Sequence, residues 1–173
     1  MKRPLIALTC LAAVCLSACG YSTKSSLPPH IKTISVPPFP NKIDFQSGKS
    51  NVYVPLLEVR AHDAVVSQFL FDGNLKIAKE NDADLVLKGE LTNYDRSALR
   101  YNDNNDVQEY RITITVRLTM YDPQGVVLWE EPGFSGEDTY FLSGPNATSE
   151  AGAIEDALKD LAKRIVERTV EDW

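Results

Sequence analysis

Strict alternation of apolar and polar residues over twelve positions is the clearest pattern in this chain. From Tyr110 to Tyr121 the even positions carry Tyr, Ile, Ile, Val, Leu and Met, and the odd positions carry Arg, Thr, Thr, Arg, Thr and Tyr. A period of two predicts a β-strand with one apolar and one polar face. The same alternation places Leu85, Leu87, Gly89 and Leu91 on one side of a strand that we expect to extend to Tyr101.

Turn-forming residues connect these segments to their neighbours. Residues 102–106 read Asn-Asp-Asn-Asn-Asp and join 85–101 to 109–121. Asp122-Pro123-Gln124-Gly125 has the composition of a β-turn and leads to a returning strand over 126–131. The sequence therefore predicts an antiparallel meander, with 134–142 as a separate candidate edge segment. Shorter β-rich stretches predict strands at 31–36 and 75–78.

Apolar residues at helical spacing predict two helices. The first runs from Pro55 to Asp72 and ends before Gly73. The second follows Thr148 or Ser149, either of which can cap its first turn. The core stripe of the first helix is Leu57, Ala61, Ala64, Val65 and Phe69; that of the second is Ala151, Ile154, Leu158, Leu161 and Ile165. Leu56, Val59, Val66 and Leu70 widen the first stripe, which predicts burial of that helix on more than one side.

The order of these elements predicts an α+β fold. Two amphipathic helices and one sheet with a polar face form a two-layer sandwich, in which both helices pack on one mixed or antiparallel sheet of about four strands. We expect residues 31–173 to form a single domain.

The N-terminal segment has the features of a lipoprotein signal. Met1-Lys2-Arg3 is basic, and the apolar stretch that follows is shorter than the ~20 residues a membrane-spanning helix needs. It ends in Leu16-Ser17-Ala18-Cys19, which matches the bacterial lipobox. We expect residues 1–18 to be cleaved, Cys19 to carry the covalent lipid, and residues 19–30 to form a tether. The alternative is an ordinary signal peptide in which Cys19 stands by coincidence.

Charge and cysteine content change once this segment is removed. The precursor has 173 residues and a formal net charge of −6. Without residues 1–18 it has 155 residues and, having lost Lys2 and Arg3, a charge of −8. Cys19 is then the only cysteine, so no internal disulfide is expected. The acidity argues against nucleic acid as a partner, because phosphate binding needs clustered positive charge. Gly20 after the cysteine, in place of Asp, favours the outer membrane.

The search for catalytic chemistry gives little. The sequence has no phosphate-binding loop, nucleophile elbow or metal-binding histidine pair. His30 and His62 are expected in the tether and on the first helix. Asp103 and Asp106 lack the other features of a calcium loop, and an Asn/Asp-rich turn explains them. We therefore expect a protein that is not an enzyme, with no metal and no cofactor besides the lipid on Cys19.

Arginines around the long hairpin are the candidate binding residues. Arg96, Arg100 and Arg111 lie near its predicted tip, and Arg117 lies on its polar face. One interpretation is an anion-binding end, for example for phosphorylated lipid headgroups. The other is a solvated strand face on which these arginines pair with Asp95, Glu109 or Glu90.

Several motifs together resemble the LptE family of lipopolysaccharide-assembly lipoproteins. They are Cys19-Gly20-Tyr21, Leu27-Pro28-Pro29-His30-Ile31-Lys32-Thr33-Ile34-Ser35-Val36-Pro37-Pro38-Phe39, Asp82-Ala83-Asp84-Leu85-Val86-Leu87-Lys88-Gly89-Glu90-Leu91 and Val127-Leu128-Trp129-Glu130. Gly136, Tyr140 and the C-terminal helix also fit. The resemblance implies two helices on a four-stranded sheet, seated as a plug inside the LptD-type outer-membrane β-barrel.

The same resemblance implies a role in assembling that barrel and in delivering lipopolysaccharide to the outer leaflet. It implies a monomer within a heterodimer, lipid-anchored at the outer membrane and reaching from the periplasmic side into the barrel lumen. It does not assign lipopolysaccharide contacts residue by residue, so Arg96, Arg100 and Arg111 rest on charge and position. An alternative is a secretion-pore or pilotin-type envelope lipoprotein that binds a secretin or self-assembles.

Overall fold

The meander expected from the alternation pattern forms the centre of the molecule. The computed structural model describes residues 27–44 and 53–171. The predicted signal peptide, Cys19 and most of the tether lie outside these residues. The elements are β1 (Thr33–Ser35), α2 (Leu57–Asp72), β2 (Lys76–Ile77), the 3-10 helix η1 (Glu80–Asp82), β3 (Leu85–Tyr101), β4 (Val107–Tyr121), β5 (Val127–Phe141) and α3 (Glu150–Glu171). None of the helices in this part of the chain is long and apolar enough to cross a membrane.

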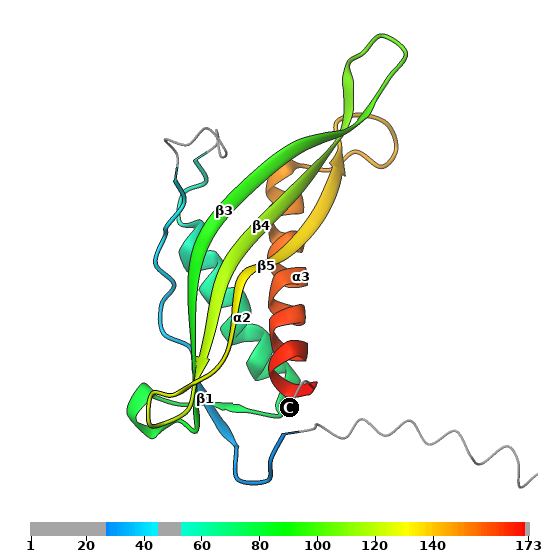
Figure 1. Cartoon of the computed structure of the whole chain (residues 1–173). Helices are drawn as coiled ribbons and strands as arrows, with labels where there is room; N and C mark the ends of the chain where they lie inside the picture. The colour runs from blue at the N-terminus through cyan, green and yellow to red at the C-terminus, as the bar shows by residue number, and fades with distance from the viewer. Residues whose placement is uncertain (1–26, 45–52, 172–173) are drawn as a thin grey trace, which may run out of the picture.

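The sheet has five strands in the order β2-β1-β3-β4-β5. β1 is parallel to both β2 and β3, whereas β3, β4 and β5 are antiparallel to one another. Both helices cover the same face of the sheet (Figure 1). The predicted α+β two-layer sandwich is confirmed, with one more strand than expected. Neither α2 nor α3 covers the opposite face of the sheet, here called the open face, and only η1 lies beside one end of it.

The alternation of the two long strands sorts their side chains between core and open face. Ile112, Ile114, Val116, Leu118 and Met120 of β4 are fully buried against the helices. Opposite them, β3 contributes Leu87, Leu91 and Tyr94. The threonines and arginines that alternate with the β4 core residues lie on the open face. The tip of the β3–β4 hairpin extends beyond the ends of both helices (Figure 1).

The last strand differs from the prediction, which divided it into 126–131 and 134–142. β5 is continuous from Val127 to Phe141. Its pairing with β4 shifts between Val116↔Phe134 and Leu118↔Glu131, so one β4 residue faces Pro132 and Gly133 together. This is a β-bulge, which absorbs the extra residue without ending the strand. Proline is tolerated there because β5 is an edge strand.

The first helix also departs from expectation. Leu57, Ala61, Val65 and Phe69 are buried, as their spacing predicts. However, of the four residues that widen this stripe, Leu56, Val59 and Leu70 are exposed and only Val66 is partly buried against the core, so the prediction of burial on more than one side was wrong. A two-layer sandwich offers α2 only the sheet and α3 to pack against, which covers one side. The helix ends as predicted at Gly73, which has φ 76° and donates its N–H to Phe69 O.

The C-terminal helix lies unusually close to β5. Its first turn is capped by Ser149, whose Oγ accepts from Gly152 N at 3.0 Å, as expected. A Cβ atom placed on Gly136 would lie 2.4 Å from Leu161 N and 2.5 Å from Ala157 O. Glycine at this position therefore lets the α3 backbone contact the strand directly.

Candidate functional site

The three candidate arginines lie on two different faces of the long hairpin. Arg96 is paired in register with Ile112, a core position, and its side chain is directed toward α3. Arg111 is paired with Ser97 and belongs to the open face. A register shift between Ala98 and Arg100 moves Arg100 to that open face as well, opposite Glu109. The structure thus brings Arg100 and Arg111 to one surface and separates Arg96 from them.

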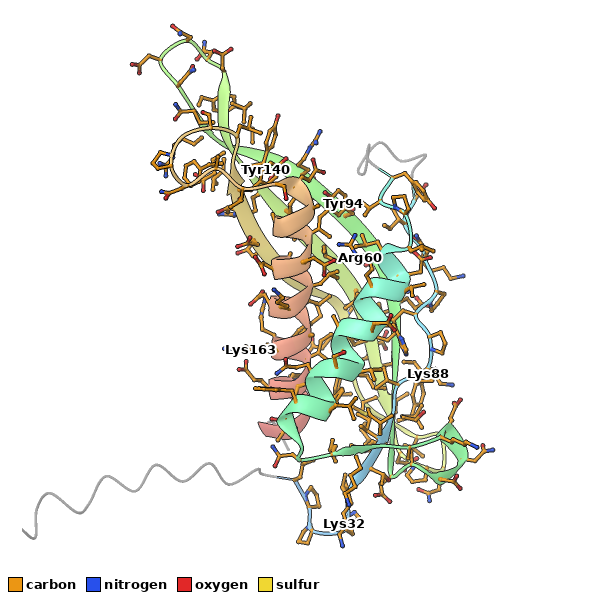
Figure 2. The ribbon with its side chains drawn as sticks, turned by 180° about the vertical axis from the view of Figure 1, so that it is seen from behind. Lys32, Arg60, Lys88, Tyr94, Tyr140 and Lys163 are labelled. Carbon is orange, nitrogen blue, oxygen red and sulfur yellow. The ribbon has the colours of Figure 1, made fainter. Side chains whose placement is uncertain are left out.

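Arg96 is part of a hydrogen-bonded cluster at the start of α3. Its Nη1 donates to Glu150 Oε2 at 2.8 Å. The Tyr94 hydroxyl donates to Oε1 of the same carboxylate at 2.9 Å, and the Tyr140 hydroxyl donates to Oε2 at 3.2 Å. In Figure 2, Tyr94 and Tyr140 lie beside the first turn of α3. The cluster therefore connects β3, β5 and α3 through one carboxylate.

Aromatic packing supports this cluster. The rings of Tyr110 and Tyr140 stack with centroids 5.6 Å apart, and the Arg96 guanidinium lies 5.1 Å from the Tyr110 centroid. An arginine with a charge-assisted partner and an aromatic platform is held in one orientation. Arg96 is consequently a structural residue where the hairpin leaves the helix layer.

The protonation states of the cluster follow from its geometry. Burial raises the pKa of Glu150, but hydrogen bonds from Arg96 and Tyr94 outweigh this, and the pKa lies below its usual value. Burial, reinforced by the negative charge of Glu150, raises the pKa of both Tyr94 and Tyr140. The hydrogen bond to Glu150 raises the pKa of Arg96. At neutral pH the cluster is an ion pair flanked by two neutral phenols.

Arg100 lies over a buried acid near the hairpin tip. Its Nε is 3.4 Å from Glu109 Oε2, and its guanidinium lies 5.5 Å from the Phe141 ring centroid. Glu109 is only 5% exposed, and its Oε2 accepts no hydrogen bond from the described residues. The pairing of Arg100 with Glu109 is one that the sequence had suggested.

Ion pairs continue along the open face away from the tip. Arg111 Nε lies 3.7 Å from Glu137 Oε2, and Arg117 Nη1 lies 3.1 Å from Glu90 Oε2. Between them the register aligns Thr113 with Asp95 and Thr115 with Asn93. The open face is thus a hydrophilic strip of hydroxyls and ion pairs in which each of these arginines has an acidic neighbour. The hairpin end carries cations, but their charge is locally balanced.

The loop at the hairpin tip is held by its own side chains. Asn102 Oδ1 accepts from the backbone N–H groups of Asn104 and Asp106, each at 2.9 Å. Asn105 adopts a left-handed conformation with φ 64°, which asparagine tolerates. The part of the chain described contains no group of three or more metal-ligating side chains. The Asn/Asp-rich turn expected for this segment is what the geometry supports.

Sequence reasoning missed Glu150 as the organising residue of the Arg96 cluster. The convergence of Tyr94, Arg96 and Tyr140 on its carboxylate was not expected. Strand register and the packing of α3 bring the four residues together, and no local sequence motif predicts this arrangement. His62 lies on α2, as expected, with Nε2 3.0 Å from Val36 O and Nδ1 3.0 Å from Asp63 Oδ1.

Comparisons with known proteins identify a matching family and solved structures with a similar fold. The family model described as LptE, lipopolysaccharide-assembly, matches residues 31–169. The comparison with curated proteins gives no match. Among solved structures, protein XCC0632 from Xanthomonas campestris is similar with a TM-score of 0.56 at 14% identity, covering 86% of this chain and 91% of that one. The hypothetical protein CT253 from Chlamydia trachomatis has a TM-score of 0.54 at 12% identity, covering 80% and 95%. At such identities these structures establish the fold alone.

Proposed function

This chain belongs to the LptE family of lipopolysaccharide-assembly proteins, and from that premise we propose that it is a non-enzymatic outer-membrane lipoprotein that plugs an LptD-type β-barrel. In this role it helps the barrel assemble and assists insertion of lipopolysaccharide into the outer leaflet. Lipidation of Cys19 after removal of residues 1–18 would supply the anchor. The family match spans the folded domain and does not favour the secretion-pore or pilotin alternative.

The polar open face is the observation that carries the plug proposal. A barrel lumen is polar, so a protein seated inside it must present polar surface while keeping its own core. Here Thr113, Thr115 and the Arg117–Glu90 pair provide such a surface without help from a second layer.

The placement of the ends is consistent with the orientation we propose. The described chain begins at Leu27, at the end of the molecule opposite the hairpin tip (Figure 1). A lipid on Cys19 would hold that end at the periplasmic side. The hairpin would then extend into the lumen, away from the anchor.

We further propose that lipopolysaccharide phosphates contact the hairpin end through the candidate arginines. Arg100 and Arg111 share the open face, and their carboxylate contacts at 3.4 and 3.7 Å are longer than a good charge-assisted hydrogen bond. A phosphate can therefore compete for them. Arg96 would act by keeping the hairpin in place, because its 2.8 Å bond to Glu150 is already optimal.

The plug proposal is tested by affinity purification from outer membranes, with a photo-cross-linking amino acid in place of Thr115. We expect a large outer-membrane β-barrel protein to co-purify and to cross-link to this position. Depletion of the protein should lower the amounts of folded barrel and of surface lipopolysaccharide. Normal barrel and surface lipopolysaccharide after depletion would refute the proposal.

The lipopolysaccharide contact is tested by titrating immobilised lipopolysaccharide with the double variant Arg100→Gln/Arg111→Gln. Arg117→Gln is the matched control, because Arg117 lies on the same strand and face as Arg111 and is also paired with a glutamate. The double variant should bind several-fold more weakly than the control. Equal binding by both variants would exclude a specific role for the hairpin end.

A further inference from the structure

Among the residues that the structure describes, half of the large exposed apolar side chains lie at one end of the molecule. This end, here called the base, comprises the last turn of α2, β2, the β4–β5 turn and residues 27–31. Figure 1 shows these segments together, opposite the hairpin tip. The exposed apolar residues of the base are Leu70, Phe71, Ile77, Val126, Val127 and Leu128. Phe71 is 86% exposed, more than any other large apolar residue described.

The base also contains a groove of about 420 Å³ between residues 28–31 and the β4–β5 turn. Its lining is mixed, with apolar Pro28, Ile31, Leu85, Pro123 and Leu128 beside polar His30, Asp84, Asp122 and Gln124. Three consecutive exposed apolar residues at a turn, beside such a groove, are unusual for a surface in water. They indicate that something apolar covers the base.

The chain outside the structure indicates what that covering is. Cys19 precedes Leu27 by eight residues. Eight residues of extended chain span at most about 29 Å, so a lipid on Cys19 keeps the base within that distance of a bilayer surface. Apolar side chains held this close to a bilayer gain by entering its headgroup–acyl boundary.

The charges of the base agree with an apolar mode of contact. Lys76 in the base, with Lys32 and Lys79 next to it, is outnumbered by the carboxylates in or beside the same segments, which are Asp72, Glu80, Asp82, Asp84 and Asp122. Electrostatic attraction to anionic lipid therefore contributes little, and contact should not require it. We propose that the base is seated on the phospholipid leaflet, with Phe71 and Val126–Leu128 inserted at its surface. This proposal rests on the lipidation of Cys19 that the proposed function includes.

The two ends of β5 provide a matched test. Val127 begins this strand at the base and is 50% exposed, and Leu142 directly follows its other end and is 52% exposed. The two positions are fifteen residue steps apart along the strand, which corresponds to about 50 Å of extended chain. If Cys19 is lipidated, a cysteine introduced at either position is the only free thiol in the mature protein.

The experiment uses the full chain, matured in cells and reconstituted with its co-purified partners in phosphatidylcholine vesicles. Val127→Cys, Phe71→Cys and Leu142→Cys are each labelled with an environment-sensitive fluorophore. Brominated phosphatidylcholine should quench the labels at 127 and 71 several-fold more than the label at 142, and raising the salt concentration should not change this. Equal quenching at both ends, or none at the base, would overturn the seating, as would protection of the base by a second copy or a partner instead of lipid.

The unsubstituted chain separates this proposal from the one on which it rests. If its thiol reacts with the fluorophore, Cys19 is not lipidated and the anchor itself is refuted. If it does not react, but the base labels remain in water, the anchor stands and the seating fails.

Discussion

Replacing Gly136 with alanine should test the close packing of α3 on the sheet. The new Cβ would lie 2.4 Å from Leu161 N, 2.5 Å from Ala157 O and 2.5 Å from Leu161 Cβ. Ordinary contacts between such atoms are near ~3.5–4.0 Å, so α3 must move by about 1 Å. Two of the three atoms belong to the helix backbone, and no side-chain rotation can relieve them.

The cost of this substitution can be bounded from similar overpacked cores. Such substitutions cost about 1–3 kcal/mol and occasionally more. Because the clash is with backbone along a helix that buries nine apolar side chains, we expect a loss of about 3 kcal/mol. In a domain of this size that corresponds to a decrease in Tm of about 6–12 °C.

Gly133→Ala is the internal control for Gly136→Ala. Gly133 lies in the same strand, has no positive φ, and a Cβ there would meet nothing within 4 Å. Gly133→Ala therefore only reduces the conformational entropy of the unfolded chain, which should raise the free energy of unfolding by about 0.4–1 kcal/mol. Urea and thermal denaturation of both variants measure the difference. Stability of Gly136→Ala within about 0.5 kcal/mol of the parent, or equal losses in both variants, would refute the reasoning.

Three further substitutions have defined outcomes. Gly89→Ala would place a Cβ 2.4–2.7 Å from the Phe39 ring and should cost about 1–3 kcal/mol in thermal denaturation, with a smaller cost in a Phe39→Ala background. Glu150 has a lowered pKa in the folded state, so its ionised carboxylate contributes to the free energy of unfolding above its unfolded pKa, and this contribution is lost as pH falls through the folded pKa. Glu150→Gln should therefore remove this loss from the free energy of unfolding measured between pH 7 and pH 3. The Asp84 carboxylate accepts hydrogen bonds from Lys32 N, Thr33 N and Thr33 Oγ1 and so holds the start of β1 in place. Asp84→Asn should therefore speed hydrogen exchange of the Lys76 N–H, which donates to the Lys32 carbonyl, and unchanged exchange would exclude this role of Asp84.

Period-two patterning was sufficient to predict the central strands. β3 has the predicted bounds, and β4 begins two residues early. The pattern succeeds here because each strand has one face on the helices and one in solvent, so burial and sequence alternate together. In β5 the same reasoning stopped at Pro132-Gly133, since a bulge on an edge strand removes the penalty that proline has elsewhere in a sheet.

The candidate site was only partly accessible to sequence reasoning. The charge pattern found Arg96, Arg100 and Arg111, and it suggested the Arg100–Glu109 pair. It could not tell that a register shift after Ala98 puts Arg100 on the open face while Arg96 stays on the helix side. A shift of one residue reverses the face of each following side chain, and nothing in the local sequence specifies where it occurs.

The error about α2 is more informative than the successes, because Leu70, one of the residues that misled the burial prediction, lies beside Phe71 where both can make contacts outside the chain. Leu70 and Phe71 follow the buried Phe69, and nothing in the described domain covers them. Local rules tend to fail in natural proteins where a functional surface needs residues that folding alone would not select. The exposed end of α2 and the β4–β5 turn coincide with the end at which the described chain begins, whereas the open face is polar along the strands that run away from it. An apolar base and a polar sheet face on one small domain are the division expected of a protein held at a bilayer at one end and surrounded by a hydrophilic wall along its length.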